Sequence, residues 1–214
     1  MSAASPSAPF PKILVCTDGS PDSEGAITAA LNLAKTTGST VFLLEVLFYL
    51  AGYELQAPDT LAPPIVNMEL MQAQETAVRE RLEARKTEAA REGVTLEPRV
   101  RTGSSAYEGI LEEAGESQPD LIIMGRHGYT GLTRLLMGSV TARVIGHSPC
   151  DVLVVPQGVA PDTGIVQQAI KNEVDLIIVG SYGRTGLKKL LMGSVTERVI
   201  GGSPCPILVV KQPG

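Results

Sequence analysis

Aromatic side chains are scarce in this chain: they make up 4% of its 214 residues, and there is no tryptophan. Hydrophobic residues still account for 43% of the sequence, which is normal for a protein that buries a full core. That core must be aliphatic, which favours a parallel sheet covered on both faces by helices. Positive charge is also in the minority, with a formal net charge of −5, so the composition indicates no basic surface for DNA or RNA.

Cysteine and histidine are few as well. The three cysteines, Cys16, Cys150 and Cys205, form no C-x-x-C pair, and His127 and His147 are the only histidines. This pattern argues against a zinc site and against a secreted disulfide framework. We expect reduced thiols, with Cys150 and Cys205 buried at the same place in two repeated S-P-C tripeptides.

Long apolar runs are missing too. No stretch reaches the roughly 18 apolar residues of a membrane span. Residues 1–11 are rich in Ser, Ala and Pro and lack the basic and apolar regions of a signal peptide. We therefore expect a disordered leader over residues 1–11, no membrane contact and a cytoplasmic location.

The hydrophobic pattern alternates between short apolar runs and helical periodicity. Ser20 and Pro21 are suited to start the first helix, as its N-cap and first-turn residue, and Gly38 to end it. The pattern predicts strands over 12–17, 40–47, 96–101, 120–124 and 151–155, and helices over 21–37, 67–92, 106–117 and 139–146. This order predicts an α/β fold for residues 12–156: an open, parallel, five-stranded sheet with helices on both faces.

The rest of the chain repeats the end of this domain. Residues 109–157 align without a gap on residues 164–212, and about 30 of the 49 aligned positions are identical. Residues 157–163 read as a linker. Residues 164–214 form a partial repeat of helix, strand, helix and strand, with no counterpart of the first three strands.

Both copies carry a glycine-rich loop after an apolar strand. Its spacing is Gly, two residues, Gly, nine residues, Gly-Ser: Gly125, Gly128, Gly138 and Ser139 in the first copy, and Gly180, Gly183, Gly193 and Ser194 in the second. Glycines let a phosphate approach the backbone, and the helix that follows offers free N–H groups to an anion. The alternative is that the glycines only turn the chain and the serine only caps a helix. The loop is neither a P-loop nor a dinucleotide fingerprint, since G-K-[ST] and G-x-G-x-x-G are absent.

These motifs together resemble the universal stress protein family. The resemblance rests on ILVCTDGS, VFLLEVL, DLIIMG, the loop with its Gly-Ser, and the PC-x-VLVV ending, in order over the first 156 residues. It implies a Rossmann-like fold, a homodimer formed through the last strands, and binding of ATP, or of ADP or AMP, with or without Mg²⁺.

The resemblance also implies roles for particular residues. Asp18, with Thr17 beside it, would face the adenosine, and Val46 would contact the adenine. The other candidate ligand residues come from the loop and its flanks: Met124, Gly125, Arg126, Gly128, Gly138, Ser139 and Val140. Asp18 could instead be a turn residue, Val46 ordinary core and Arg126 a solvated side chain.

Two features depart from the family pattern. Glu45 stands where members often have histidine, and its carboxylate could alter the nucleotide preference or simply face solvent. The second copy keeps the loop, with Arg184, Lys188 and Lys189 in it, but has no equivalent of Asp18 or Val46. We therefore expect no self-sufficient nucleotide site in the second copy.

Three function classes follow from this reading. The leading hypothesis is a regulatory protein or sensor in the stress response whose nucleotide occupancy sets its conformation or partners. A slow ATPase or phosphotransferase would need a metal, its ligands and a base, and no catalytic residue is evident. The third class is an interaction module without nucleotide. For the half copy, we expect packing on the full domain, or on a neighbouring chain, through dimer-like contacts.

Overall fold

The computed structural model describes residues 9–48, 68–128, 137–156, 164–180 and 194–211. Its strands are β1 (Lys12–Thr17), β2 (Thr40–Phe48), β3 (Leu96–Gly103), β4 (Leu121–Gly125), β5 (Asp151–Val155), β6 (Ile177–Gly180) and β7 (Ile207–Val210). Its helices are α1 (Pro21–Thr37), α2 (Met68–Arg91), α3 (Ala106–Ser117), α4 (Ser139–His147), α5 (Gly164–Lys171) and α6 (Ser194–Gly202). Each strand and helix expected from the sequence is present, with bounds that agree within about two residues. The expected leader and linker lie outside the described residues, apart from residues 9–11.

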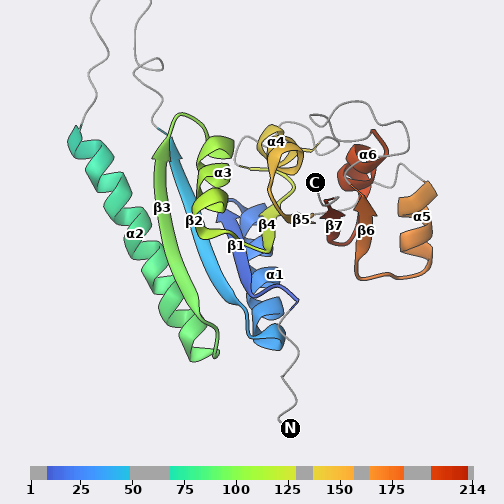
Figure 1. Ribbon diagram of the computed structural model, residues 1–214, viewed down its shortest axis with the longest axis horizontal. Helices are drawn as coiled ribbons and strands as arrows, with labels where there is room; N and C mark the ends of the chain where they lie inside the picture. The colour runs from blue at the N-terminus through green and yellow to red at the C-terminus, as the bar shows by residue number, and fades with distance from the viewer. Residues whose placement is uncertain (1–8, 49–67, 129–136, 157–163, 181–193, 212–214) are drawn as a thin grey trace, which may run out of the picture.

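The strands form one seven-stranded sheet in the order β3-β2-β1-β4-β5-β7-β6 (Figure 1). The five strands of the first copy are parallel throughout, as predicted. The two strands of the half copy are parallel to each other, but β7 joins β5 antiparallel, with Leu153 opposite Leu208. The sheet is therefore mostly, not wholly, parallel.

The β5–β7 pairing also determines whether the last strands keep a free edge for pairing with another chain. β5 lies between β4 and β7, and β7 lies between β5 and β6. Both edges of each strand are therefore hydrogen-bonded inside the chain. A homodimer formed through either of them, as the family resemblance implied, would require this pairing to open.

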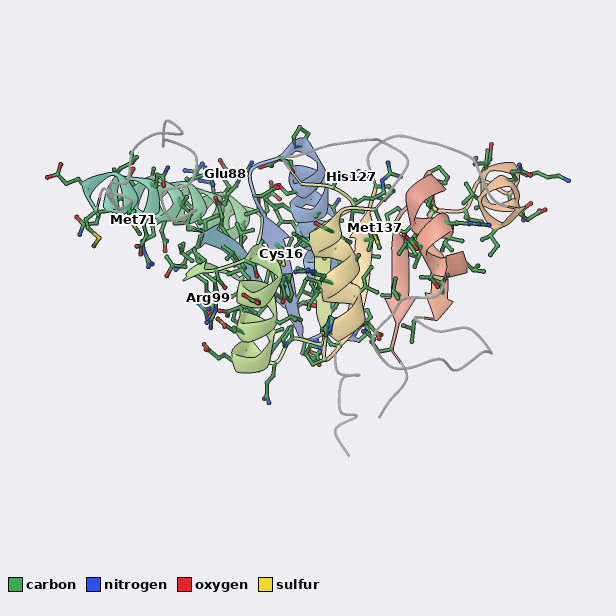
Figure 2. The ribbon with its side chains drawn as sticks, turned by 90° about the horizontal axis from the view of Figure 1, so that it is seen from above. Cys16, Met71, Glu88, Arg99, His127 and Met137 are labelled. Carbon is green, nitrogen blue, oxygen red and sulfur yellow. The ribbon has the colours of Figure 1, made fainter. Side chains whose placement is uncertain are left out.

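Helices cover the two faces of the sheet unequally. α1 and α2 pack on one face of the first copy, and α3 and α4 on the other (Figure 2). The apolar cluster under α3 and α4 continues across β5 and β7 beneath α5 and α6, through Val154, Val209 and Val199. The half copy thus shares a core with the full domain on this face.

The opposite face of the half copy is different. Ile178 and Leu176 are 62% and 44% exposed, whereas Ile123 and Leu121 at the equivalent positions of the first copy are 0% and 1% exposed. In the first copy these positions belong to the cluster that α1 covers. Of the described residues, seven of the nine large hydrophobic side chains that are exposed lie between residues 165 and 210. On this face, the half copy therefore has the apolar residues of a core, but over the described residues they stay exposed to solvent.

The first helix is built as the sequence indicates. The hydroxyl of Ser20 accepts a hydrogen bond from the amide of Ser23, and Pro21 occupies the first turn. Gly38 ends the helix with φ of 73°, a left-handed conformation that glycine adopts without strain. This placement brings the β1–α1 turn, with Asp18, to the carboxyl edge of the sheet.

No described helix combines the length and the apolar character needed to cross a membrane.

Candidate nucleotide site

A cavity of about 640 Å³ opens at the carboxyl edge of β1, β2 and β4, between α2 on one side and α3 and α4 on the other. This is where ligands bind in open α/β sheets. Its walls contain nine of the ten candidate residues: Thr17, Asp18, Val46, Met124, Gly125, Gly128, Gly138, Ser139 and Val140. The structure therefore brings together residues from four separate stretches of sequence. The exception is Arg126, whose side chain is not part of the cavity wall.

Asp18 is held at the turn after β1. Its Oδ1 accepts a hydrogen bond from the amide of Ser20 at 3.0 Å, and Gly19 has φ of 77°. The hydroxyl of Thr17 accepts from the amide of Gly19 at 3.1 Å and shares a hydrogen bond with the hydroxyl of Ser23 at 3.0 Å. Asp18 therefore both stabilises the turn after β1 and lines the cavity, because its side chain also reaches the glycine-rich loop.

The loop approaches Asp18 so closely that a side chain at Gly128 would force Asp18 to move. A Cβ added at Gly128 would lie 2.6 Å from Asp18 Oδ2, and one at Gly138 would lie 3.1 Å from the carbonyl oxygen of Arg126. The two limbs of the loop, marked by His127 and Met137 in Figure 2, are joined by a hydrogen bond of 3.0 Å from the amide of Gly138 to the carbonyl of Arg126. The backbone of these two limbs, around residues 126–128 and 137–138, forms a narrow cradle. Residues 129–136, which connect the limbs, lie outside the described residues.

The start of α4 faces this cradle. Gly138 is the N-cap residue, and no side chain caps the helix there. Ser139 is exposed and, with Val140, lines the cavity. Because the first amides of a helix have no acceptor within the helix, and the helix dipole is positive at this end, the position suits an anion.

Thr141 anchors the start of the loop through its hydroxyl group, a role that sequence analysis did not assign to it. Its hydroxyl donates to the carbonyl of Gly125 at 3.0 Å and lies 3.4 Å from that of Arg126. The hydroxyl of Thr196 donates to the carbonyl of Gly180 in the same way at 3.0 Å. The available signal was the G-S-V-T tetrapeptide, which recurs unchanged in both copies.

The far wall of the cavity comes from α2, a helix that sequence analysis did not connect with the site. Arg81 lines the cavity there and forms an ion pair with Glu45, which is 7% exposed on β2. Glu45 is therefore not a solvent-facing residue but a buried carboxylate in the cavity wall. No local sequence signal predicts this pair, because its partners are 36 residues apart and meet only through the packing of α2 beside β2.

The apolar part of the wall sits opposite the cradle. Val46 packs so tightly on α3 that a Cβ at Gly109 would lie 2.7 Å from its Cγ1. Cys16 is buried at the base of the cavity, and burial, followed by the nearby Cys150 and Glu113, raises the pKa of its thiol. The thiol is therefore protonated and acts as an apolar wall group. Of the two thiols that the sequence predicted to be buried, Cys205 is buried and Cys150 is half-buried.

The described part of the second loop is limited to its two ends, Gly180 at the end of β6 and Ser194 at the start of α6. Gly183, Arg184, Lys188, Lys189 and Gly193 lie outside the described residues, so the question of phosphate contacts there stays a prediction. Over the described residues, no three His, Cys, Asp or Glu side chains gather in a way that could hold a metal ion.

The fold and the cavity define an α/β protein with a glycine cradle at the carboxyl edge of a parallel sheet. The sequence matches the model of the universal stress protein family twice, over residues 9–156 and again over 157–211. The chain belongs to this family, as the resemblance of its motifs predicted.

Individual relatives agree with this assignment. Universal stress protein YxiE of Bacillus subtilis is 34% identical over 152 residues, which cover 68% of this chain and 99% of YxiE. Universal stress protein MJ0531 of Methanocaldococcus jannaschii is 53% identical over 53 residues, 25% of this chain, but that match spans only 31% of the relative. The solved structure of MJ0577 from the same organism superposes with a TM-score of 0.59 at 29% identity, over 70% of this chain and 97% of MJ0577.

Proposed function

We propose that this chain binds one adenine nucleotide, ATP or its products ADP and AMP, in the cavity, and that occupancy regulates what the protein contacts. The observation that carries the proposal is the close approach of Gly128 and Gly138 to Asp18 and Arg126 in front of the start of α4. A side chain at either glycine would press against Asp18 or against the backbone of Arg126 and His127, so glycine keeps the two limbs of the loop close together at the start of α4, an arrangement that suits a phosphate chain.

The remaining walls match the other parts of a nucleotide. Asp18 supplies a carboxylate acceptor of the kind that recognises ribose hydroxyls, and Val46 and Ile110 supply an apolar surface for the base. The volume of about 640 Å³ lies within the range of small-molecule and cofactor sites. Mg²⁺ would be carried mainly by the phosphates, as is usual for this ion.

The site count in this proposal is one per chain. The half copy repeats the loop but has no counterpart of β1 and β2, which contribute Asp18 and Val46 to the first site. We further propose that the β5–β7 pairing takes the place, within one chain, of the homodimer that the family resemblance implied. A cytoplasmic location is part of the proposal, since the three cysteines carry free thiols.

Isothermal titration of ATP into the full-length protein, with and without Mg²⁺, tests the proposal. We expect one site per chain in the wild type. Gly128→Ala should abolish or strongly weaken binding, because its Cβ would collide with Asp18. Gly115→Ala is the matched control, since a Cβ there meets no atom within 4 Å and Gly115 lies on α3 away from the cavity.

Three results would overturn the proposal in different ways. Absence of heat in the wild type would leave an interaction module without nucleotide. Two sites per chain would mean that the second loop is completed by another chain. Equal binding by the wild type and Gly128→Ala would place the nucleotide elsewhere. Release of phosphate above background in the same samples would favour a slow ATPase over a sensor.

A further inference from the structure

Arg126 is the residue of the loop that the proposed nucleotide site leaves unexplained. It follows β4 directly, between Gly125 and Gly128, yet it is only 2% exposed and is among the largest fully buried side chains of the described residues. Burying a guanidinium away from water is costly unless its donors find acceptors. The contacts of this side chain therefore show what its position is for.

The guanidinium of Arg126 crosses into the half copy. Its Nη1 donates to the carbonyl oxygen of Gly201 at 2.9 Å and lies 3.5 Å from that of Ile200. These are carbonyls of the last turn of α6, which have no amide partner within the helix and lie at the negative end of its dipole. A cation from the first copy thus caps a helix of the second.

The backbone carbonyl and the Nε of Arg126 connect this residue to the candidate site. Its carbonyl accepts the hydrogen bond from Gly138 that joins the two limbs of the cradle. Its amide donates to the carbonyl of Val155 at 3.2 Å. Its Nε donates to Nε2 of His127 at 3.1 Å, and His127 lines the cavity. One residue therefore links α6 to both the cradle and the cavity wall.

A second contact of the same kind runs in the opposite direction. Lys211, just after β7, donates from Nζ to the carbonyl of Ile145 in the last turn of α4. Ile145 and Ile200 are equivalent positions of the two copies. Burial lowers the pKa of Lys211, while Cys150 and Asp151 act against this shift. Each copy thus caps a helix of the other, so the interface between them is reciprocal and built from charged groups as well as from the shared core.

We infer that the half copy is an intramolecular support for the nucleotide loop, with Arg126 as the positioning residue that couples α6 to the cradle. This inference rests on the proposed nucleotide site and deepens it by stating how the site is regulated. When α6 is docked, Arg126 holds the cradle in the shape that accepts phosphates. By linkage, nucleotide in the cradle stabilises the docking of α6 to the same extent.

The test compares Arg126→Met and Arg126→Lys with the wild type, all as full-length chains. Arg101→Met is the matched control: Arg101 is 20% exposed and ion-paired with Glu113 and Glu116, does not itself line the cavity, and lies on β3, the edge strand farthest from the half copy. Each protein is titrated with ATP by calorimetry. Hydrogen exchange of peptides covering residues 137–147 and 194–205 is measured with and without ATP, and circular dichroism checks that each variant is folded.

We expect Arg126→Met to weaken ATP binding about tenfold, within the usual range of coupling between sites. Arg126→Lys should recover part of the loss because its ammonium can still donate to a carbonyl, and Arg101→Met should bind as the wild type does. ATP should slow exchange in α6 of the wild type but not of Arg126→Met. Without nucleotide, Arg126→Met should exchange faster at the start of α4, a readout that does not depend on ATP.

The outcomes separate this inference from the proposed function. If folded Arg126→Met binds ATP as tightly as the wild type, or if ATP leaves exchange in α6 of the wild type unchanged, the coupling is refuted while the nucleotide site stands. If the wild type takes up no ATP, the proposed function and the coupling fail together. Equal weakening by Arg101→Met would assign the effect to general stability and would also refute the coupling.

Discussion

The internal repeat offers a stability experiment in which the protein supplies its own control. Ile123 on β4 and Ile178 on β6 occupy equivalent positions within the same Asp-Leu-Ile-Ile tetrapeptide. Ile123 is 0% exposed and belongs to the cluster beneath α1, whereas Ile178 is 62% exposed. The same substitution, isoleucine to alanine, should therefore have very different effects at the two positions.

The size of each effect follows from what the side chain has around it. Replacing isoleucine by alanine removes three carbon groups, each worth about 0.8 kcal/mol when buried. At Ile123 a cavity would remain in the cluster beneath α1, beside Val15 on the neighbouring strand, so we expect a total loss of about 3 to 4 kcal/mol. At Ile178 most of the side chain is already in water, and the expected loss is below about 1 kcal/mol.

Urea unfolding followed by far-ultraviolet circular dichroism measures both variants against the wild type, since the chain has no tryptophan for fluorescence. For a chain of this size, the loss at Ile123→Ala corresponds to a fall in melting temperature of roughly 10 °C. Equal losses for the two variants would refute the reasoning, because they would mean that the outer face of β6 is covered in solution. Light scattering over a range of protein concentrations would then show whether a second copy provides the cover.

Three further predictions concern the site. Thr141→Val should lower the free energy of unfolding by about 1 to 2 kcal/mol, because it leaves the carbonyl of Gly125 without its donor; urea unfolding checks this, and an unchanged midpoint would contradict it. Arg81→Met should cost about 1 kcal/mol, a value reduced by the 51% exposure of Arg81, and Glu45→Gln should remove most of that cost in a double-mutant cycle. Burial raises the pKa of Cys16, so its stabilising contribution is full below the unfolded pKa of about 8.5 and is lost progressively as the pH rises above it. The difference in unfolding free energy between the wild type and Cys16→Ala should therefore shrink between about pH 7.5 and about pH 9.5; a difference that grows would refute the sign.

Much of the first copy was predictable because its signals are local. The apolar run at 12–17, the Ser20-Pro21 start and the Gly38 end each determine an element without reference to the rest of the chain, and the structure has them at these positions. The cradle was predictable for a related reason: the spacing of Gly125, Gly128 and Gly138 places glycines on both limbs of one loop.

The parts that sequence reasoning missed depend on contacts between distant segments. The pairing of Glu45 with Arg81 requires knowing that α2 lies beside β2. To predict where the side chain of Arg126 points, one must know that α6 ends beside β4. Sequence analysis assigned Arg126 to the nucleotide or to solvent, although it expected the half copy to pack on the full domain or on a neighbouring chain. Its side chain instead contacts the half copy, which could not be placed before the antiparallel β5–β7 pairing was known.

That pairing also explains how a repeat can persist without half of its domain. The half copy keeps α5, β6, α6 and β7, the elements that pack on the shared face and on β5. It lacks the strands and helices that would cover its other face and complete a second cavity. The retained elements are those needed to occupy the free edge of β5, to accept the guanidinium of Arg126 and to return Lys211 to α4. The inferred role as a support for the first site requires only these elements, and it does not require that core-pattern residues such as Ile178 be covered.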